Sequence, residues 1–594
     1  GGEKADFRLS FTSTNQTGVV PGSDYNKYAF SVNAGMNFTK NFTGRISAQY
    51  IRSDSEGRPA QGANDSNLLI PLINGLPRTI DIHDIQKNWI DENGKQITLD
   101  PEGKSNNPYW IINKNKFTNN LDRMIGNITL TYKPIEGLTI TNNAGTDFYT
   151  EGRRKVYAKG TVGALNGKFQ TWNLYKRIIN NDLMVSYEKT FANDYHFKVM
   201  MGHNLYQEEW KNENVQAQNL VVDGLYTYTN AKSTTPVNYY EKKRLVGLYG
   251  DISLGYKDML FVNVTGRNDW SSTLPSETRS YFYPAVSGSI IMSQLLKMPE
   301  WLNFWKLRGA WTVTKSDLGI YDTNQAYSVS TNVWDGMNTA VYPEMIRSTT
   351  LEPTAARSYE IGTAFNVWDN RLRFDISYYN KLKYNLTREA TISGSSGFTK
   401  TLVNYDEEQV RRGVEVSLTA SLIQTKDWNW EVNANWARDR YFYAKVDPVY
   451  STQKPWVAAG KRWDWYGIYD WERDPQGNII HENGYPVQSK YQSVMGNEYP
   501  DWIWGLSTTL RYKDWTLGIS LDGRVGGMAY SRTEQTMWNT GVHPDSDNKW
   551  RYDEVVNGKK NYVGQGVKVV SGKVEYDTTG KIVSDTRVFA PNDT

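Results

Sequence analysis

The chain has 594 residues, no cysteine and a net charge of +3, with 67 Lys and Arg against 64 Asp and Glu. Without cysteine there is no disulfide framework, thiolate metal site or cysteine nucleophile, and a balanced charge without a basic block argues against nucleic acid as a partner. No run approaches the roughly 20 apolar residues of a membrane helix, and the mean hydropathy is −0.64, so a helical membrane protein is excluded. The 13% aromatic content leaves open a membrane β-barrel, in which only alternate strand residues face lipid.

Alternation of apolar and polar residues predicts about seventeen strands, each near the roughly 10 residues that a tilted barrel strand needs. In the segment 28–38, for example, Tyr28, Phe30 and Val32 alternate with small or polar residues. In chain order the predicted strands cover 7–14, 28–38, 43–52, 123–133, 138–149, 172–188, 195–210, 243–256, 260–269, 286–293, 303–314, 357–367, 371–386, 412–423, 428–436, 501–512 and 515–522.

The connections between these strands alternate in length. Short turns are expected at 39–41, 134–137, 192–195, 257–258, 368–370, 425–427 and 513–514, with a modest one at 296–302. Long polar connections lie between them, near 53–120, 213–241, 315–356, 389–410, 446–500 and from 531 onward. Short turns at one end and long loops at the other are typical of an outer-membrane barrel, and a propeller or sandwich would not sort its loops in this way.

Five tryptophans stand beside the predicted short turns: Trp301, Trp305, Trp368, Trp428 and Trp515. Trp is enriched where a membrane protein meets the lipid–water interface. We therefore expect an aromatic belt at the end that carries the short turns. The alternative is that these rings form the core of a soluble β-protein.

The predicted hairpin from 257 to 293 carries the most specific motif of the chain. Residues 267–275 read R-N-D-W-S-S-T-L-P, and residues 279–289 read R-S-Y-F-Y-P-A-V-S-G-S. These two runs, in this order and spacing, resemble a signature of the SusC/RagA-type TonB-dependent outer-membrane transporters. The segments Leu351-Glu352-Pro353 and Ser358-Tyr359-Glu360-Ile361-Gly362 are similar to another pattern of that family, with Thr354 in place of its usual Glu.

The resemblance implies an all-β fold, a large antiparallel transmembrane β-barrel of the 22-stranded TonB-dependent transporter type, of which this chain supplies about 17 strands. Residues 1–594 would then be an incomplete transmembrane β-barrel domain. We expect an N-terminal plug domain upstream of Gly1 and closing strands after Thr594.

The same resemblance implies a function in the bacterial outer membrane. It points to TonB-dependent import of an oligosaccharide or oligopeptide, energised by TonB–ExbB–ExbD acting on the plug, with a SusD-like surface lipoprotein as partner. No cofactor is implied. The rival hypothesis is a structural or adhesive surface β-protein without transport, and a barrel hydrolase comes third.

No catalytic constellation stands out, so we do not expect an enzyme. The five histidines, at 83, 196, 203, 481 and 543, have no HExxH or i, i+4 spacing, which argues against a histidine metal site. Asp545, Asp547 and Asn548 have calcium-ligand chemistry, but a solvated loop is the favoured interpretation. The run Gly394–Gly397 is a turn and lacks the G-x-S-x-G elbow.

One long connection is rich in aromatic residues and is the predicted substrate-binding site. Rings beside hydrogen-bonding groups suit sugar faces or peptide side chains. The alternative is that these rings pack the loop against itself or against a partner protein. The candidate residues are Trp456, Trp463, Trp465, Tyr466, Tyr469 and Trp471, with Lys461, Arg462, Asp464 and Asp470 among them.

The strand pattern also predicts which side chains face lipid. Val262 and Ile519 belong to the apolar sets, and Thr265 to a polar one. Many polar positions carry charges or amides that cannot all reach one another across a wide barrel, so they need water or a plug as partners. They include Arg267, Asp269, Arg373, Asp375, Glu415, Glu431, Asn433, Arg511 and Asp522.

Overall fold

The structure is a computed structural model, and it describes all residues except 1, 3, 61–66, 69–79, 100–102 and 594. Seventeen of its strands belong to one large sheet, as the sequence predicts. The chain divides into two compact units. Unit 1 holds residues 1–185, 203–246 and 530–561, and unit 2 holds 186–202, 247–529 and 562–594. In the described part of the chain, none of the helices is long and apolar enough to cross a membrane.

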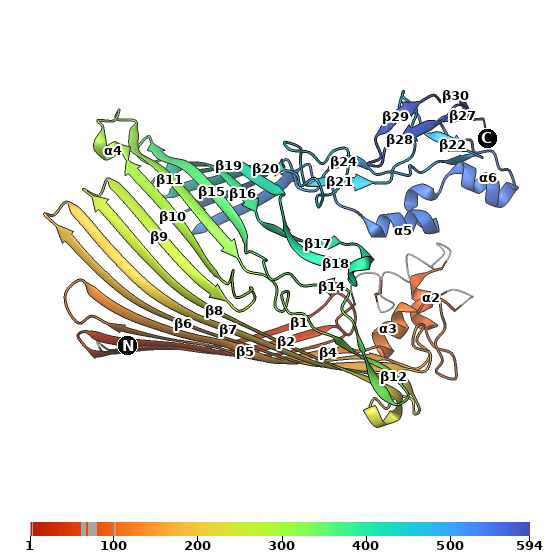
Figure 1. Ribbon diagram of the computed structural model, residues 1–594, viewed down its shortest axis with the longest axis horizontal. Coiled ribbons are helices and arrows are strands. Elements are labelled where there is room, and N and C mark those ends of the chain that lie inside the picture. The colour runs from red at the N-terminus through yellow and green to blue at the C-terminus, as the bar shows by residue number, and fades with distance from the viewer. Residues whose placement is uncertain (1, 3, 61–66, 69–79, 100–102, 594) are drawn as a thin grey trace. The chain divides into compact units, whose positions relative to one another are not determined.

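The first five strands of unit 1 form an antiparallel series in chain order, coloured red to orange in Figure 1. Across it, Phe11 pairs with Phe30 and Phe30 with Tyr50, so like residues stack on one face. These strands are β1 (Ala5–Thr17), β2 (Asp24–Thr39), β3 (Phe42–Glu56), β4 (Phe117–Tyr132) and β5 (Leu138–Tyr157). Three long strands contribute to both units: β6 (Lys168–Phe191), β7 (Tyr195–Leu220) and β8 (Ala231–Tyr256).

Unit 2 continues in the same way, and Figure 1 shows its strands running side by side. Each pairs antiparallel with the next wall strand along the chain. They are β9 (Leu260–Ser271), β10 (Ser280–Ile291), β11 (Leu302–Ser316), β15 (Thr354–Val367), β16 (Leu372–Tyr384), β19 (Glu408–Gln424), β20 (Trp428–Lys445), β25 (Trp502–Tyr512) and β26 (Trp515–Val525). All seventeen predicted strands are therefore confirmed.

The two faces of the wall differ as the alternation predicts. On β9, Val264 is 43% exposed, whereas Asp269 on the opposite face is 4% exposed. On β4 the exposed residues Met124, Ile128 and Leu130 share one face, which is apolar. We call this apolar face the lipid face and the opposite, polar face the lumen face.

The short turns follow from local backbone chemistry. Lys257 and Asp258 both have positive φ, 51° and 52°, which is the requirement of the two-residue turn that matches strand twist. Trp368, Asp369 and Asn370 also have positive φ. Beside these turns, Trp301, Trp368, Trp428 and Trp515 are exposed, while Trp305 donates its indole N–H to Thr363.

Most of the predicted strands were too short, although those at 371–386 and 501–512 were slightly longer than β16 and β25. The connection predicted at 213–241 is wrong for most of its length, because β7 continues to Leu220 and β8 begins at Ala231, giving two strands of 26 residues. The outer parts of both strands are mostly polar, so apolar alternation ends before the strands do, and Ala217 and Leu220 of β7 are buried in a cluster with Val156 and Phe169. The connection predicted at 53–120 falls partly outside the described residues.

Several long connections contain structure of their own that alternation did not reveal. The short helices are α2 (Ile82–Lys87), α3 (Pro108–Lys114), α4 (Met292–Leu295), α5 (Arg532–Thr540) and α6 (Lys549–Asn557). The small sheets use β12 (Ser328–Trp334), β13 (Met337–Val341), β14 (Met345–Ile346), β17 (Leu386–Thr391), β18 (Lys400–Tyr405), β21 (Trp465–Ile468), β22 (Ile480–Glu482), β23 (Tyr485–Pro486), β24 (Ser493–Asn497), β27 (Val567–Ser571), β28 (Val574–Tyr576), β29 (Ile582–Asp585) and β30 (Val588–Pro591).

Candidate functional site

Ion pairs on the lumen face join adjacent strands or cross over one intervening strand. Arg308 of β11 holds Asp375 of β16 through two hydrogen bonds of 2.7 Å, passing over β15 at Gly362. In unit 1, Arg123 of β4 holds Asp147 of β5 in the same two-pronged way, at 2.8 and 2.5 Å. A two-pronged Arg–carboxylate pair fixes both position and orientation, so these side chains lie along the wall.

A glycine leaves room for a polar cluster around the Asp439 carboxylate. Arg411 of β19 contacts Asp439 of β20, and the hydroxyls of Tyr379 and Tyr441 point to the same carboxylate at 3.4 and 3.1 Å. A Cβ at Gly413 would lie 2.7 Å from the Tyr379 hydroxyl oxygen, so any side chain there would displace the ring. The cluster therefore depends on a glycine that period-two patterning treats as neutral.

The expectation that the lumen charges could not pair with one another is correct only in part. Arg267, Asp269, Arg373, Asp375, Glu431 and Asn433 all have polar partners within the wall. Glu415, Arg511 and Asp522 have none among the residues that the structure describes. Among the described residues, most of these polar side chains thus have hydrogen-bonding or ion-pair partners within the wall, and three do not.

The signature motif anchors the long connections to the wall. Arg267 donates to Asp269 at 2.8 Å, and the Tyr283 hydroxyl donates to the other oxygen of Asp269 at 2.5 Å. Ser271 and Thr273 donate to Asp317, at 2.5 and 3.1 Å, which ties the β9 end to the connection after β11.

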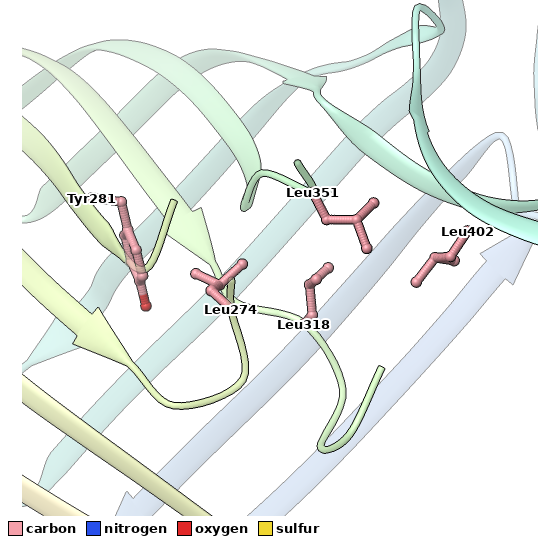
Figure 2. Packing of buried hydrophobic residues seen from close by; sticks show 5 residues of the cluster. All are labelled: Leu274, Tyr281, Leu318, Leu351 and Leu402. Atoms are coloured by element: carbon pink, nitrogen blue, oxygen red, sulfur yellow. The ribbon is translucent and has the colours of Figure 1, made fainter. Parts of the chain in front are cut away.

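A buried apolar cluster lies next to this polar network (Figure 2). Leu274 and Tyr281 of the signature pack with leucines of two other connections, those between β11 and β15 and between β16 and β19, and Leu351 is 1% exposed. The Thr278 hydroxyl donates to the Leu351 carbonyl at 2.6 Å. Leu351 begins the second family-like segment, so the two motifs meet in one core. The cluster consists of Leu274, Tyr281, Leu318, Leu351 and Leu402.

The six rings of the predicted binding loop differ in how far they are packed against other residues. Trp456 and Trp465 pack edge to face, with ring centres 5.4 Å apart, and the Trp465 indole N–H donates to the Tyr443 hydroxyl at 3.2 Å. Trp463 packs edge to face on Tyr441 of β20 at 5.1 Å. These three rings are half-buried and fasten the loop to the end of β20.

The remaining rings of that loop are less engaged. Tyr466 lies in β21 and is half-buried opposite Gly496 of β24. Tyr469 and Trp471 follow β21 and are exposed, at 53% and 43%. Of the polar residues between the rings, Asp464 is fully buried and is held by Arg462. Only Tyr469 and Trp471 of the candidate set thus offer large open ring faces.

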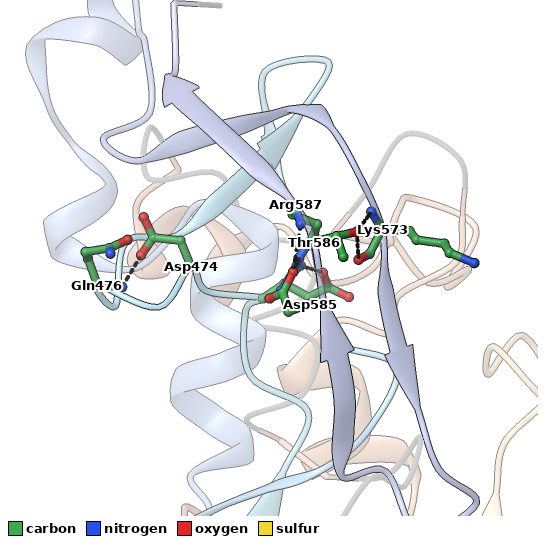
Figure 3. Close-up of polar contacts among 7 residues, drawn as sticks. Asp474, Gln476, Lys573, Asp585, Thr586 and Arg587 are labelled. Atoms are coloured by element: carbon green, nitrogen blue, oxygen red, sulfur yellow. Dashed lines mark hydrogen bonds and ion pairs between the residues drawn. The ribbon is translucent and has the colours of Figure 1, made fainter.

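An outer segment of unit 2 is built from two distant stretches, 472–492 and 562–593. Strand β22 runs parallel to β27, and β27 pairs with β30. Arg587, with 6% of its side chain exposed, holds Asp585 at 2.8 Å (Figure 3) and also holds Glu472 at 3.0 Å. The hydrogen bonds from Arg587 hold the pKa of the Asp585 carboxyl below its usual range.

Tight aspartate turns cap the hairpins of this segment. Burial disfavours the charged Asp474 carboxylate, but hydrogen bonds from the Asn478 side chain and from backbone N–H groups, including that of Gln476 in Figure 3, outweigh burial and lower its pKa. Asp577 accepts from Thr579 and Lys581 in the same way, and its pKa is also lowered.

The sequence D-x-x-G is the shared signal of these turns. It occurs at 474–477, at 577–580 and again at 91–94, where Asp91 accepts from the N–H groups of Asn93 and Lys95. It was recognisable in the sequence as a turn pattern, since Asp bonds its own downstream backbone. The alternation of apolar and polar residues does not reveal this turn pattern.

The other chemical candidates have structural roles. Asn548 caps α6 by accepting from the Arg551 N–H, and Gly394–Ser396 is a single turn ended by Gly397 at positive φ. Within the described ranges, no group of three or more His, Asp or Glu side chains is placed to hold a metal ion.

Curated proteins with similar sequences are TonB-dependent receptors. One from Formosa agariphila is 21% identical over 602 residues, which cover 93% of this chain and 59% of that protein. The TonB-dependent receptor SusC of Bacteroides thetaiotaomicron is 21% identical over 582 residues, covering 89% of this chain and 57% of SusC. The chain therefore spans less than three-fifths of the length of these relatives. No family model matches the chain.

Solved structures with the same fold include two of the RagAB system. The RagAB peptide transporter superposes with a TM-score of 0.75 at 16% identity, covering 88% of this chain and 60% of that one. The closed-closed state of the RagAB peptide importer gives 0.73 over 89% of this chain and 61% of that one. Sequence similarity and fold together confirm the resemblance carried by the signature: the chain is similar in sequence and in fold to the β-barrel wall of SusC/RagA-type TonB-dependent transporters.

Proposed function

We propose that the protein containing this chain imports a large nutrient across the bacterial outer membrane, using energy delivered by TonB. The observation that carries the proposal is the two-faced wall. Its outer face is apolar where lipid would lie, and its lumen face is lined by ion pairs such as Arg308–Asp375 and Arg123–Asp147. A lumen of this polarity suits the passage of a hydrated solute.

A plug domain fits the charges that the wall does not satisfy itself. Glu415, Arg511 and Asp522 face the lumen without partners among the described residues. A plug offering complementary groups would satisfy these side chains and would keep a wide lumen from leaking. Movement of that plug by TonB would then open the path, which is how a plugged barrel couples import to energy.

The long connections suit a surface partner and a large substrate. We propose a SusD-like lipoprotein at the end opposite the short turns, and an oligosaccharide or oligopeptide as cargo. Tyr469 and Trp471 are the two rings of the predicted binding loop with open faces for such contacts. The other four rings of the loop are half-buried and offer less open area; they are Trp456, Trp463, Trp465 and Tyr466.

Uptake by cells that make the full-length protein tests the proposal. Fluorescent oligopeptides and oligosaccharides too large for porins are supplied to cells with and without functional TonB. We expect one class of solute to accumulate inside the cells only when both the protein and TonB are present. Surface binding without accumulation would contradict transport and would favour the adhesive alternative.

A further inference from the structure

Two adjoining cavities open on the lumen face of unit 1, at the end opposite the short turns. The first has a volume of about 520 Å³, and its wall includes Tyr25, Asn119 and Tyr149 as well as the carboxylates of Asp24, Glu56 and Glu151. The second, of about 360 Å³, shares Arg58 and Pro59 with the first. Both volumes lie in the range of small-ligand pockets, roughly 300–1,000 Å³.

The second cavity has an apolar floor. Ile112 of α3, Phe117 at the start of β4 and Trp172 of β6 line it, together with Pro21 and Val156. Phe117 pairs across the ladder with Lys155 of β5, so it lies on the same face as the lumen residues of that strand. A floor of aliphatic and aromatic groups favours an apolar side chain, which leaves water on entering it.

The helix that forms part of this floor is held firmly. Trp110 of α3 is 3% exposed, and its indole N–H donates to the Thr161 hydroxyl at 2.9 Å. Asn107 caps α3 by accepting from the Tyr109 N–H, and its own N–H donates to Gln96 at 2.8 Å. A buried, hydrogen-bonded support of this kind preforms the cavity and lowers the entropic cost of binding.

The rim of the apolar cavity is cationic. Lys116 and Arg153 are already paired with Glu56 and Glu151. Arg58 and Lys155 contact only rings, at 5.9 Å from Phe117 and 5.1 Å from Tyr157, and have no carboxylate partner in the described part of the chain. Two cations that form no ion pair in the described part of the chain, beside an apolar floor, match a ligand that carries an anion next to an apolar group, while the carboxylates of Asp24, Glu56 and Glu151 line the first cavity.

Resting on the proposed function, we propose that this pair of cavities binds the C-terminal end of an oligopeptide. The terminal carboxylate lies at Arg58 and Lys155, and the last side chain, an apolar one, enters the cavity lined by Ile112, Phe117 and Trp172. The first cavity, beside it, receives the preceding peptide units through Tyr25, Asn119 and Tyr149. A neutral oligosaccharide has no anion for the two cations and would leave the aliphatic floor uncovered, so the chemistry favours peptide cargo.

Binding to the purified full-length protein in detergent tests this subsite. The probes are the peptide Gly-Ser-Gly-Ser-Gly-Leu with a free carboxylate, its C-terminal amide, the same peptide ending in Ser, and maltohexaose. We expect the free Leu peptide to bind about tenfold more tightly than either its amide or the Ser peptide, since one lost ion pair or apolar contact costs about that factor. Maltohexaose should bind more weakly than all three.

Two variants locate the binding on the structure. The double variant Arg58→Gln and Lys155→Gln should weaken the free peptide about tenfold and leave the amide unchanged, because only the free peptide uses the cations. The control Lys381→Gln removes a lumen-face cation of unit 2 and should change the affinity for neither the free peptide nor the amide. Heat-modifiable gel migration confirms that each variant still folds as a barrel.

The subsite and the proposed function would be refuted by different results. Tight binding of maltohexaose with no binding of peptides, equal affinity for acid and amide, or indifference to the double variant would each overturn the subsite. TonB-dependent uptake would still stand in those cases. Conversely, the expected binding pattern in a protein that supports no uptake would keep the subsite and refute transport.

Discussion

The wall strands and the outer segment of unit 2 are held together by different means. In the wall, the strands from β9 to β20 pair with their neighbours over at least seven residues, and the side chains add a lipid face and a lumen face. The outer segment has strands of two to five residues. It depends on Arg587, which bridges Asp585 and Glu472, and on the aspartate turns at Asp474 and Asp577.

Because of this difference, the wall and the outer segment should respond differently to side-chain substitutions. Backbone ladders tolerate most side-chain changes, since register is fixed by many hydrogen bonds and by the face that must meet lipid. A segment of short strands has few such bonds, so a single charged side chain carries much of its order. The wall should therefore fail only at buried charges and at the lipid face, whereas the outer segment should fail at its individual polar contacts.

The largest effect is expected at a buried charge of the wall. Asp269→Ala removes the carboxylate to which Arg267 and Tyr283 both donate, in a site where that residue is 4% exposed, which should cost about 3–5 kcal/mol of folding free energy. Asp375→Ala breaks a similar pair with Arg308, but that carboxylate is 47% exposed, so about 1 kcal/mol or less is expected. Denaturant unfolding in lipid vesicles measures both. Equal losses would show that burial does not separate the two pairs.

The next effect concerns the lipid face. Val264→Arg near the middle of β9 should cost about 2–4 kcal/mol on folding into a bilayer, because a cation would enter the hydrocarbon. The matched control Thr265→Arg adds the same side chain to the lumen face and should be tolerated. If folding into vesicles ranks the two variants in the opposite order, the assignment of faces is wrong.

The outer segment should respond locally. Arg587→Met keeps apolar bulk over Phe589 but leaves Asp585 and Glu472 without their cation, a loss of about 2 kcal/mol that falls on this segment alone. Hydrogen exchange should rise in residues 567–591 and stay unchanged in β9 and β10. Loss of protection in the wall strands as well would show that the two regions unfold together.

The smallest effect is a response to acid. The pKa values of Asp474, Asp577 and Asp585 are lowered in the folded state. A lowered pKa contributes stability that is present above the ordinary value, about 4, and is lost as pH falls through the folded pKa. Limited proteolysis within 562–593 should therefore accelerate below about pH 4, with the wall intact. An acceleration between pH 5 and 7 would contradict this cause.

Alternation was enough to predict the wall because period-two burial is a property of each strand alone. Val262, Val264 and Gly266 show one face without knowledge of any neighbour. The same method could not see contacts between distant segments, such as Leu351 with Leu274 or Arg587 with Glu472. It also ended β7 too early, because the outer part of β7 is mostly polar and its Ala217 and Leu220 are buried against residues of other strands.

The candidate site was predicted by composition, and composition does not show which rings are used for packing. Trp456, Trp463 and Trp465 are rich in apolar area, and the structure uses that area to fasten the loop. The cationic cavity at Arg58 and Lys155 gave no local signal, since its residues come from six separate stretches of the chain. Only the D-x-x-G turns were visible in the sequence and were missed.

The central claim is that alternate residues of the wall face lipid and lumen, and the absence of cysteine allows a direct measurement of it. Single cysteines at each position from 260 to 269 of the full-length protein in vesicles can carry a spin label, whose collisions with oxygen and with a water-soluble nickel complex report lipid and water. The account predicts that oxygen accessibility peaks at 260, 262, 264 and 266, and nickel accessibility at 263, 265 and 267. A profile without this period of two, or with the two sets exchanged, would contradict the account.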